Sequence, residues 1–251
     1  SYNRYKFKMA AFQSRSRDQT IFSPALFNFD HLEPHTQTHL KNVYSCLSVG
    51  MLSAALGAYT HFWLGVGQWY FLTSLASIGM IIWLMATRHT KSNIGMRMGI
   101  FTGFTFLSGI SLGPLLDLVV RIEPSIVSNA LAGTAVIFIG FTLAALLSRD
   151  RKFLYLGGFL FSGLSMLILI GLFSRLFGSS LGFDVYTFGI LGLFSAFILY
   201  DTQLIIEKRR RGDDDFIWHS VDLFLDAIQI FRALMIILAK KEENKKKRRD
   251  N

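Results

Sequence analysis

The chain has 251 residues, of which 51% are hydrophobic and only 17% are charged, and its formal net charge is +9. Soluble domains carry about 25% charged residues, so this composition favours a single membrane-embedded bundle over one or two soluble domains. The chain contains one cysteine, which excludes an internal disulfide framework.

Residues 1–42 precede the first apolar run and are expected to form a cytosolic N-terminal extension. No cleavable signal peptide is apparent, because about forty mainly polar residues come before that run. His31, His35 and His39 are spaced four apart, as metal ligands on one helix face would be. Pro34 interrupts such a helix and no carboxylate is placed to complete the site, so zinc binding is disfavoured.

Seven stretches of about 20 mostly apolar residues predict membrane-spanning helices. They are 43–62, 69–87, 97–116, 126–147, 153–173, 185–206 and 216–239. The seventh is the least apolar and contains His219, Asp222, Asp226, Gln229 and Arg232. A polar helix at membrane depth is tolerated when protein surrounds it. The sequence therefore predicts an all-α membrane protein, a seven-helix transmembrane bundle with a central polar seventh helix.

The distribution of Lys and Arg predicts the orientation of the bundle. Six basic residues precede the first span. The six links between the spans then hold, in chain order, none, three, one, three, one and four, where the first three include Arg97 at the edge of the third span. This alternation places the amino terminus in the cytosol. Seven full crossings would then place the basic tail on the other side, against the same bias. The seventh segment is therefore expected either to cross or to enter and return, and the sequence leaves both open.

The tail, 240–251, contains seven of the 26 Lys and Arg residues. A basic run can bind nucleic acid, but after a hydrophobic bundle we interpret it as a cytosolic tail attracted to anionic lipid headgroups. Its candidate regulatory residues are Lys245, Lys246, Lys247, Arg248 and Arg249. No nucleic-acid partner is expected.

Two aspartates lie inside stretches that otherwise resemble membrane spans. Asp201 ends an apolar run, and Asp226 interrupts another, with Asp222 one turn before it. A carboxylate at the centre of a bilayer costs roughly 2.5–3.5 kcal/mol on insertion scales, so such acids usually have a function. The short link 207–215 would bring Asp201 and Asp226 to similar depths on antiparallel helices. A purely interfacial role is the alternative for Asp201 and Asp222.

Two carboxylates within hydrogen-bond range cannot both ionise easily, so they share a proton and titrate as a unit. We expect the protonated pair to hold its two helices together, and the ionised pair to separate them or admit a cation. Calcium prefers several carboxylate and carbonyl oxygens, so Asp201 and Asp226 are candidate calcium ligands. Arg232 is a candidate counter-charge.

The acidic run Asp213, Asp214 and Asp215 would concentrate cations at the cytosolic mouth of such a pathway. A solvated turn is the simpler interpretation of the same residues.

Several segments resemble the Bax inhibitor-1 family of transmembrane Bax inhibitor motif proteins. They are 197–208, 215–226, 82–87 and 111–114, and the resemblance extends from about Phe27 to the basic tail. It implies a multi-pass protein of the endoplasmic reticulum membrane that suppresses Bax-driven and stress-driven death, including that linked to the unfolded protein response. It also implies a pH-sensitive calcium leak, with Asp201 and Asp226 at the positions of the family's sensor pair.

The resemblance further implies binding to apoptosis regulators of the Bcl family and to other reticulum membrane proteins. It implies no enzymatic activity and no cofactor apart from calcium and protons as transported or regulatory ions. Bacterial relatives can pair the two aspartates with a basic residue in the second span, but residues 69–87 contain no Lys or Arg. That additional contact is therefore not expected in this chain.

Two other classes of protein compete with a calcium leak. One is a non-conducting membrane scaffold that binds apoptosis regulators, because such surfaces leave no motif. The other is an intramembrane aspartyl protease, since Tyr200-Asp201 resembles the first catalytic motif of presenilin-type enzymes. Asp226 lacks flanking glycines and no Pro-Ala-Leu follows it, so a substrate backbone could not approach closely. The protease is the more remote alternative.

Overall fold

The structure is a computed structural model that describes residues 33–64, 70–148 and 152–249. These residues form helices and no strand, which confirms the all-α class. The helices are α2 (Pro34–Leu64), α3 (Tyr70–Ala86), α4 (Ile94–Ser111), α5 (Gly113–Ile122), α6 (Ser125–Leu147), α7 (Leu156–Phe177), α8 (Ser180–Arg210), α9 (Phe216–Arg249) and the short 3₁₀ helix η3 (Lys152–Tyr155). Most of the expected N-terminal extension, with His31, lies outside the described residues.

The count of seven spans is not confirmed. Among the described helices, α2, α6, α7 and α8 are long and apolar enough to cross a membrane, and α4 with α5 adds a fifth span if the pair is counted as one. The third expected span, 97–116, is broken, because α4 and α5 meet at a bend of 41°. Pro114 lies in the first turn of α5, where proline is tolerated, whereas it would disrupt the interior of a continuous helix. The chain is a multi-pass helical membrane protein.

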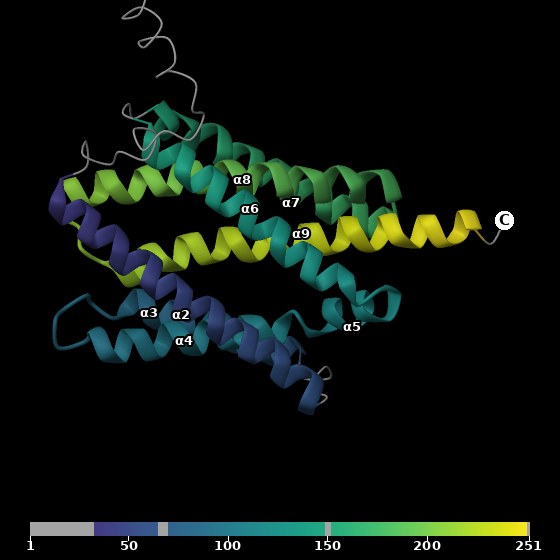
Figure 1. Cartoon of the computed structure of the whole chain (residues 1–251), viewed down its shortest axis with the longest axis horizontal. Helices are drawn as coiled ribbons and strands as arrows, with labels where there is room; N and C mark the ends of the chain where they lie inside the picture. The colour runs from purple at the N-terminus through teal and green to yellow at the C-terminus, as the bar shows by residue number, and fades with distance from the viewer. Residues whose placement is uncertain (1–32, 65–69, 149–151, 250–251) are drawn as a thin grey trace, which may run out of the picture. The chain divides into compact units, whose positions relative to one another are not determined.

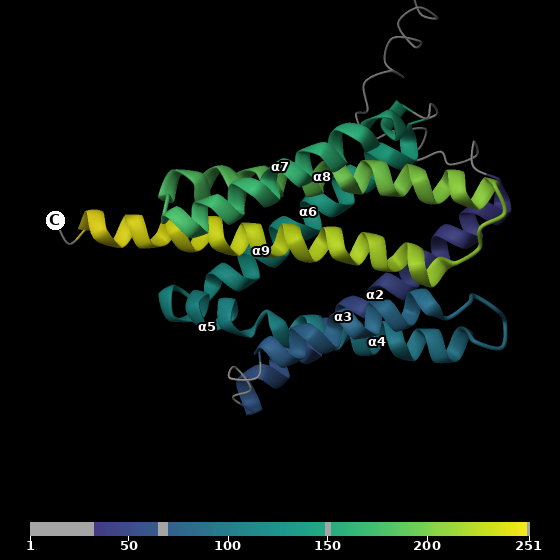
Figure 2. The same cartoon turned by 180° about the vertical axis from the view of Figure 1, so that it is seen from behind.

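The last helix, α9, is one uninterrupted helix of 34 residues, about 51 Å long at 1.5 Å per residue. This continuity argues against an entry and return within the segment. Helix α9 packs against α2, α4, α5, α6 and α8. Figure 1 and Figure 2 show it running beside α8, with α7 and α8 on one side of it and α2, α4 and α5 on the other.

The two ends of α9 lie at opposite ends of this bundle (Figure 1). Asp213 to Asp215 precede its first turn, near the start of α2, whereas the basic tail continues its last turns beyond α5. If α9 crosses the bilayer, the start of α2 and the tail lie on opposite sides of the membrane. They can both face the cytosol only if α9 does not cross it. The cytosolic position of the tail therefore stays a prediction.

Helices α2 and α4 approach one another most closely where two glycines replace side chains. A Cβ on Gly109 would lie 2.0 Å from the carbonyl oxygen of Ala54, and one on Gly57 would lie 2.1 Å from that of Phe106. Small residues allow such close backbone contact between membrane helices. Phe101 and Phe104 of α4 then reach the ring of Phe224 in edge-to-face contacts. This packing connects α4 to the part of α9 that carries the two acids.

Candidate functional site

The structure brings Asp201 of α8 and Asp226 of α9 into side-chain hydrogen-bond contact. Only 3% of Asp226 is exposed, and its Oδ2 atom has no hydrogen-bond partner among the described residues. A hydrogen bond between two carboxyl groups requires a proton on one of them. The geometry is therefore that of a carboxyl pair that can share one proton away from water.

Asp222 lies one turn before Asp226, and its charge acts on both members of the pair. Arg232, the suggested counter-charge, lies more than a turn beyond Asp226. It lines a separate cavity of about 360 Å³ together with Gln229 and Arg175, and it forms no ion pair with a described residue. Within residues 33–64, 70–148 and 152–249, no cluster of three or more His, Cys, Asp or Glu side chains could hold a metal ion. Calcium coordination by Asp201 and Asp226 stays a prediction.

Asp215 belongs to a partly buried ion pair and is not a free member of an acidic mouth. The guanidinium of Arg97, which is 3% exposed, pairs with its carboxylate, and Nδ1 of His89 lies 3.3 Å from Oδ1. Oδ1 also accepts the backbone N–H of Trp218 at 3.0 Å and so caps α9. Only Asp213 and Asp214 of the acidic run remain exposed. The only hint of this pair in the sequence was Arg97, a charged residue at the start of the third apolar stretch, 97–116.

Two histidines join the start of α2 to the start of α9. Nε2 of His39 lies 2.9 Å from Nδ1 of His219, and the two residues are 5% and 0% exposed. The sequence indicated His39 only as a disfavoured zinc ligand and His219 only as a polar residue of the seventh segment, and no local pattern indicated their contact. His35 points elsewhere, with its ring 3.1 Å from the carboxylate of Glu33.

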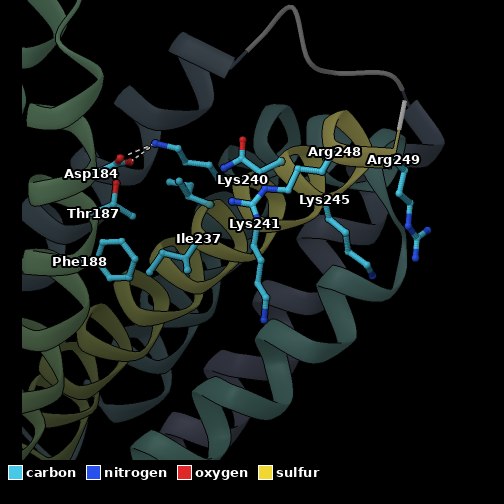
Figure 3. A pocket seen from close by; sticks show the side chains of 11 residues that line it. Asp184, Thr187, Phe188, Ile237, Lys240, Lys241, Lys245, Arg248 and Arg249 are labelled. Carbon is cyan, nitrogen blue, oxygen red and sulfur yellow. Dashed lines mark hydrogen bonds and ion pairs between the residues drawn. The ribbon is translucent and has the colours of Figure 1, made fainter. Parts of the chain in front are cut away.

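The first turn of the basic tail is attached to the bundle. Figure 3 shows Lys240 of α9 paired with Asp184, near the start of α8, and basic side chains continuing along α9 beyond it. These residues line a groove of about 710 Å³ whose apolar wall includes Phe188 and Ile237. Lys246 also donates to the carbonyl of Ile122 at the end of α5. The tail is thus a helical continuation of α9 with a basic surface.

Comparisons with known proteins agree with the family indicated by the sequence motifs. A family model described as "Inhibitor of apoptosis-promoting Bax1" matches residues 36–243. Bax inhibitor 1 of Bos taurus is 48% identical over 222 residues, which cover 88% of this chain and 94% of that protein. Bax inhibitor 1 of Homo sapiens is 47% identical with the same coverage. Bax inhibitor 1 of Arabidopsis thaliana is 39% identical over 235 residues, 91% of this chain and 92% of that protein. The chain belongs to the Bax inhibitor-1 family.

Proposed function

We propose that this protein suppresses apoptosis and stress-induced death from the endoplasmic reticulum membrane, and that it does so through a calcium leak controlled by the Asp201–Asp226 pair. Family membership supports the anti-apoptotic role, because the description of the family and the names of the relatives refer to inhibition of Bax. The observation that carries the leak mechanism is the hydrogen bond between two carboxyl groups, one of them buried. The proposal includes a cytosolic amino terminus, as the positive-inside rule favours.

The pair works as a proton-dependent contact between α8 and α9. With one shared proton, it holds the two helices together. When that proton leaves, two like charges face one another in a poorly solvated site and repel, and Asp222 adds a third negative charge. The helices then separate, and a divalent cation can replace the proton because calcium binds carboxylate oxygens. Acid therefore closes the pathway and neutral pH opens it.

We expect Asp226→Asn to abolish the pH control of calcium efflux, because an amide cannot share the carboxyl proton. Calcium efflux from liposomes that contain the purified protein, measured between about pH 5 and pH 8, should no longer depend on pH. Asp201→Asn should have the same effect, and the double variant should add nothing, because the two acids act as one unit.

Glu123→Gln is a matched control, since this residue follows α5 and lies outside the pair. It should keep the wild-type pH profile. An Asp226→Asn protein that still closes in acid would refute control by the pair.

A non-conducting scaffold is the second candidate function. The basic groove at Lys240 and the exposed tail favour it, because they offer a surface to other proteins of the reticulum membrane or to Bcl-family regulators. Absence of calcium efflux at every pH would support the scaffold. A protease is disfavoured by the packing, because Leu223 and Phe224, just before Asp226, are fully buried and leave no backbone open to a substrate.

We also propose that the tail binds anionic lipid headgroups. Each basic residue near an anionic surface contributes about 1 kcal/mol. A variant of the tail can remove five of these charges and keep the Lys240–Asp184 pair. It has Gln in place of Lys245, Lys246, Lys247, Arg248 and Arg249. Calcium efflux should then lose most of its dependence on the anionic lipid content of the liposomes, with the bundle still folded. Equal lipid dependence in the variant and the wild type would contradict this role.

A further inference from the structure

The contact between α2 and α9 depends on the two buried histidines, His39 and His219. Their facing nitrogens are 2.9 Å apart and their rings meet edge to face at a centroid distance of 5.2 Å. Next to them, the Ser220 hydroxyl oxygen lies 2.9 Å from the backbone carbonyl oxygen of Val43 and 2.7 Å from that of Phe216, so its one proton can be donated to either. Polar contacts in a buried position depend strongly on which nitrogen carries a proton.

The number of protons on the two rings decides whether this contact can exist. Nε2 of His219 lies 3.6 Å from Oδ2 of Asp213, so a proton on Nε2 is favoured there. Nδ1 of His219 is then the acceptor, and Nε2–H of His39 is the donor. A further proton on Nδ1 of His39 leaves this bond in place. A proton on Nδ1 of His219 places two N–H groups against one another, and the contact must open.

The charged neighbours come from the turn before α9 and from α8. Burial of the two rings is the largest effect and opposes their protonation, as do Lys208 and Arg209, whereas Asp213, Asp214 and Asp215 favour it. Partial burial disfavours charge on Asp213, but the backbone N–H of Asp215 and the nearby His219 still hold its pKa below the usual value. Asp213 is therefore ionised when the histidines titrate.

Asp215 connects these neighbours to the other elements packed here. It pairs with Arg97 of α4 and lies close to His89 of the α3–α4 link. His89 is consequently a third histidine at this end of the bundle.

We propose that His39 and His219 form a proton-operated latch between α2 and the first turns of α9, closed with one shared proton and released when both facing nitrogens are protonated. Asp226 lies two turns beyond His219 on the same face of α9. Release of the latch frees the first turns of α9 and weakens the Asp201–Asp226 contact. The latch itself stands on the histidine geometry; its effect on calcium rests on the proposed function.

The latch is tested directly by nuclear magnetic resonance of the ¹⁵N-histidine-labelled full chain in lipid nanodiscs. A scalar coupling between Nε2 of His39 and Nδ1 of His219 should be present near neutral pH and disappear only in strong acid, because burial opposes protonation of both rings. Two rings that titrate without any coupling would overturn the latch. So would a coupling that persists after full protonation. This result does not depend on calcium conduction.

The effect on the leak is tested with His39→Gln in the liposome assay. Glutamine can donate its amide N–H to Nδ1 of His219 and, when that nitrogen is protonated, can accept from it through the amide oxygen, so α2 and α9 stay joined in acid. Because latch release opposes closure by the acidic pair, wild-type efflux should rise again in acid strong enough to protonate both facing nitrogens, and His39→Gln should stay closed there. His35→Gln, one turn earlier on the exposed side of α2, and His89→Gln should behave as the wild type.

The outcomes separate the latch from the proposed leak. If efflux from His39→Gln rises in strong acid as the wild type does, while Asp226→Asn still abolishes pH control, the latch is overturned as a regulator and the acidic pair is left standing. No efflux in any variant, with the nuclear magnetic resonance coupling present, would overturn the leak and leave the latch standing.

Discussion

Replacing Arg97 with Met should destabilise the protein by about 1.5–3 kcal/mol, because it removes the cationic partner of the partly buried Asp215 carboxylate. Arg97 is 3% exposed and also donates to the carbonyl oxygen of Thr87. The substitution therefore also removes a donor from that backbone carbonyl. Asp215 also caps α9, so its displacement should loosen the first turn of that helix. Thermal or denaturant unfolding in detergent measures the loss.

Arg88→Met is the matched control, since Arg88 lies on the link just before α4, is exposed and forms no ion pair with a described residue. It should change stability by less than about 0.5 kcal/mol. The double variant with Asp215→Asn should recover much of the loss, because the buried charge is removed together with its partner. Equal destabilisation by Arg97→Met and Arg88→Met would show that the ion pair contributes nothing.

Gly109→Ala should prevent normal packing of α2 against α4. Its Cβ would lie 2.0 Å from the carbonyl oxygen and 2.7 Å from the carbonyl carbon of Ala54, and backbone atoms cannot move aside as a flexible side chain can. The two helices would have to separate by more than about 1 Å. Overpacking of a well-packed core costs about 1–3 kcal/mol, and a clash with a helix backbone belongs at or above the upper end. We expect a lower melting temperature and a poor yield of folded protein.

Gly99→Ala provides the comparison on the same helix, because nothing lies within 4 Å of the added Cβ. Alanine forms helices better than glycine, so this variant should be neutral or more stable by about 0.5–1 kcal/mol. If both variants lose stability equally, the close approach of α2 and α4 is not what limits the fold.

Local properties of the sequence determined the class of the protein. Hydropathy depends only on neighbouring residues, so composition and apolar runs were enough to indicate a multi-pass helical membrane protein. The two aspartates were visible for the same reason, because each interrupts an apolar run. The length of the link between their helices was enough to predict that they approach one another, and the structure places them in contact.

Only the tertiary structure decided the contacts between residues distant in the sequence. Arg97 and Asp215 are 118 residues apart, and His39 and His219 are 180 apart. Which faces of two helices meet depends on the rotation and tilt of each helix, and a run of apolar residues with no polar face does not define these. The break between α4 and α5 has both a local and a tertiary cause, because Pro114 begins α5 and Gly113, which has no Cβ, packs directly against the ring of His61. Local properties of the sequence therefore determined the presence of helices, and packing determined their polar contacts.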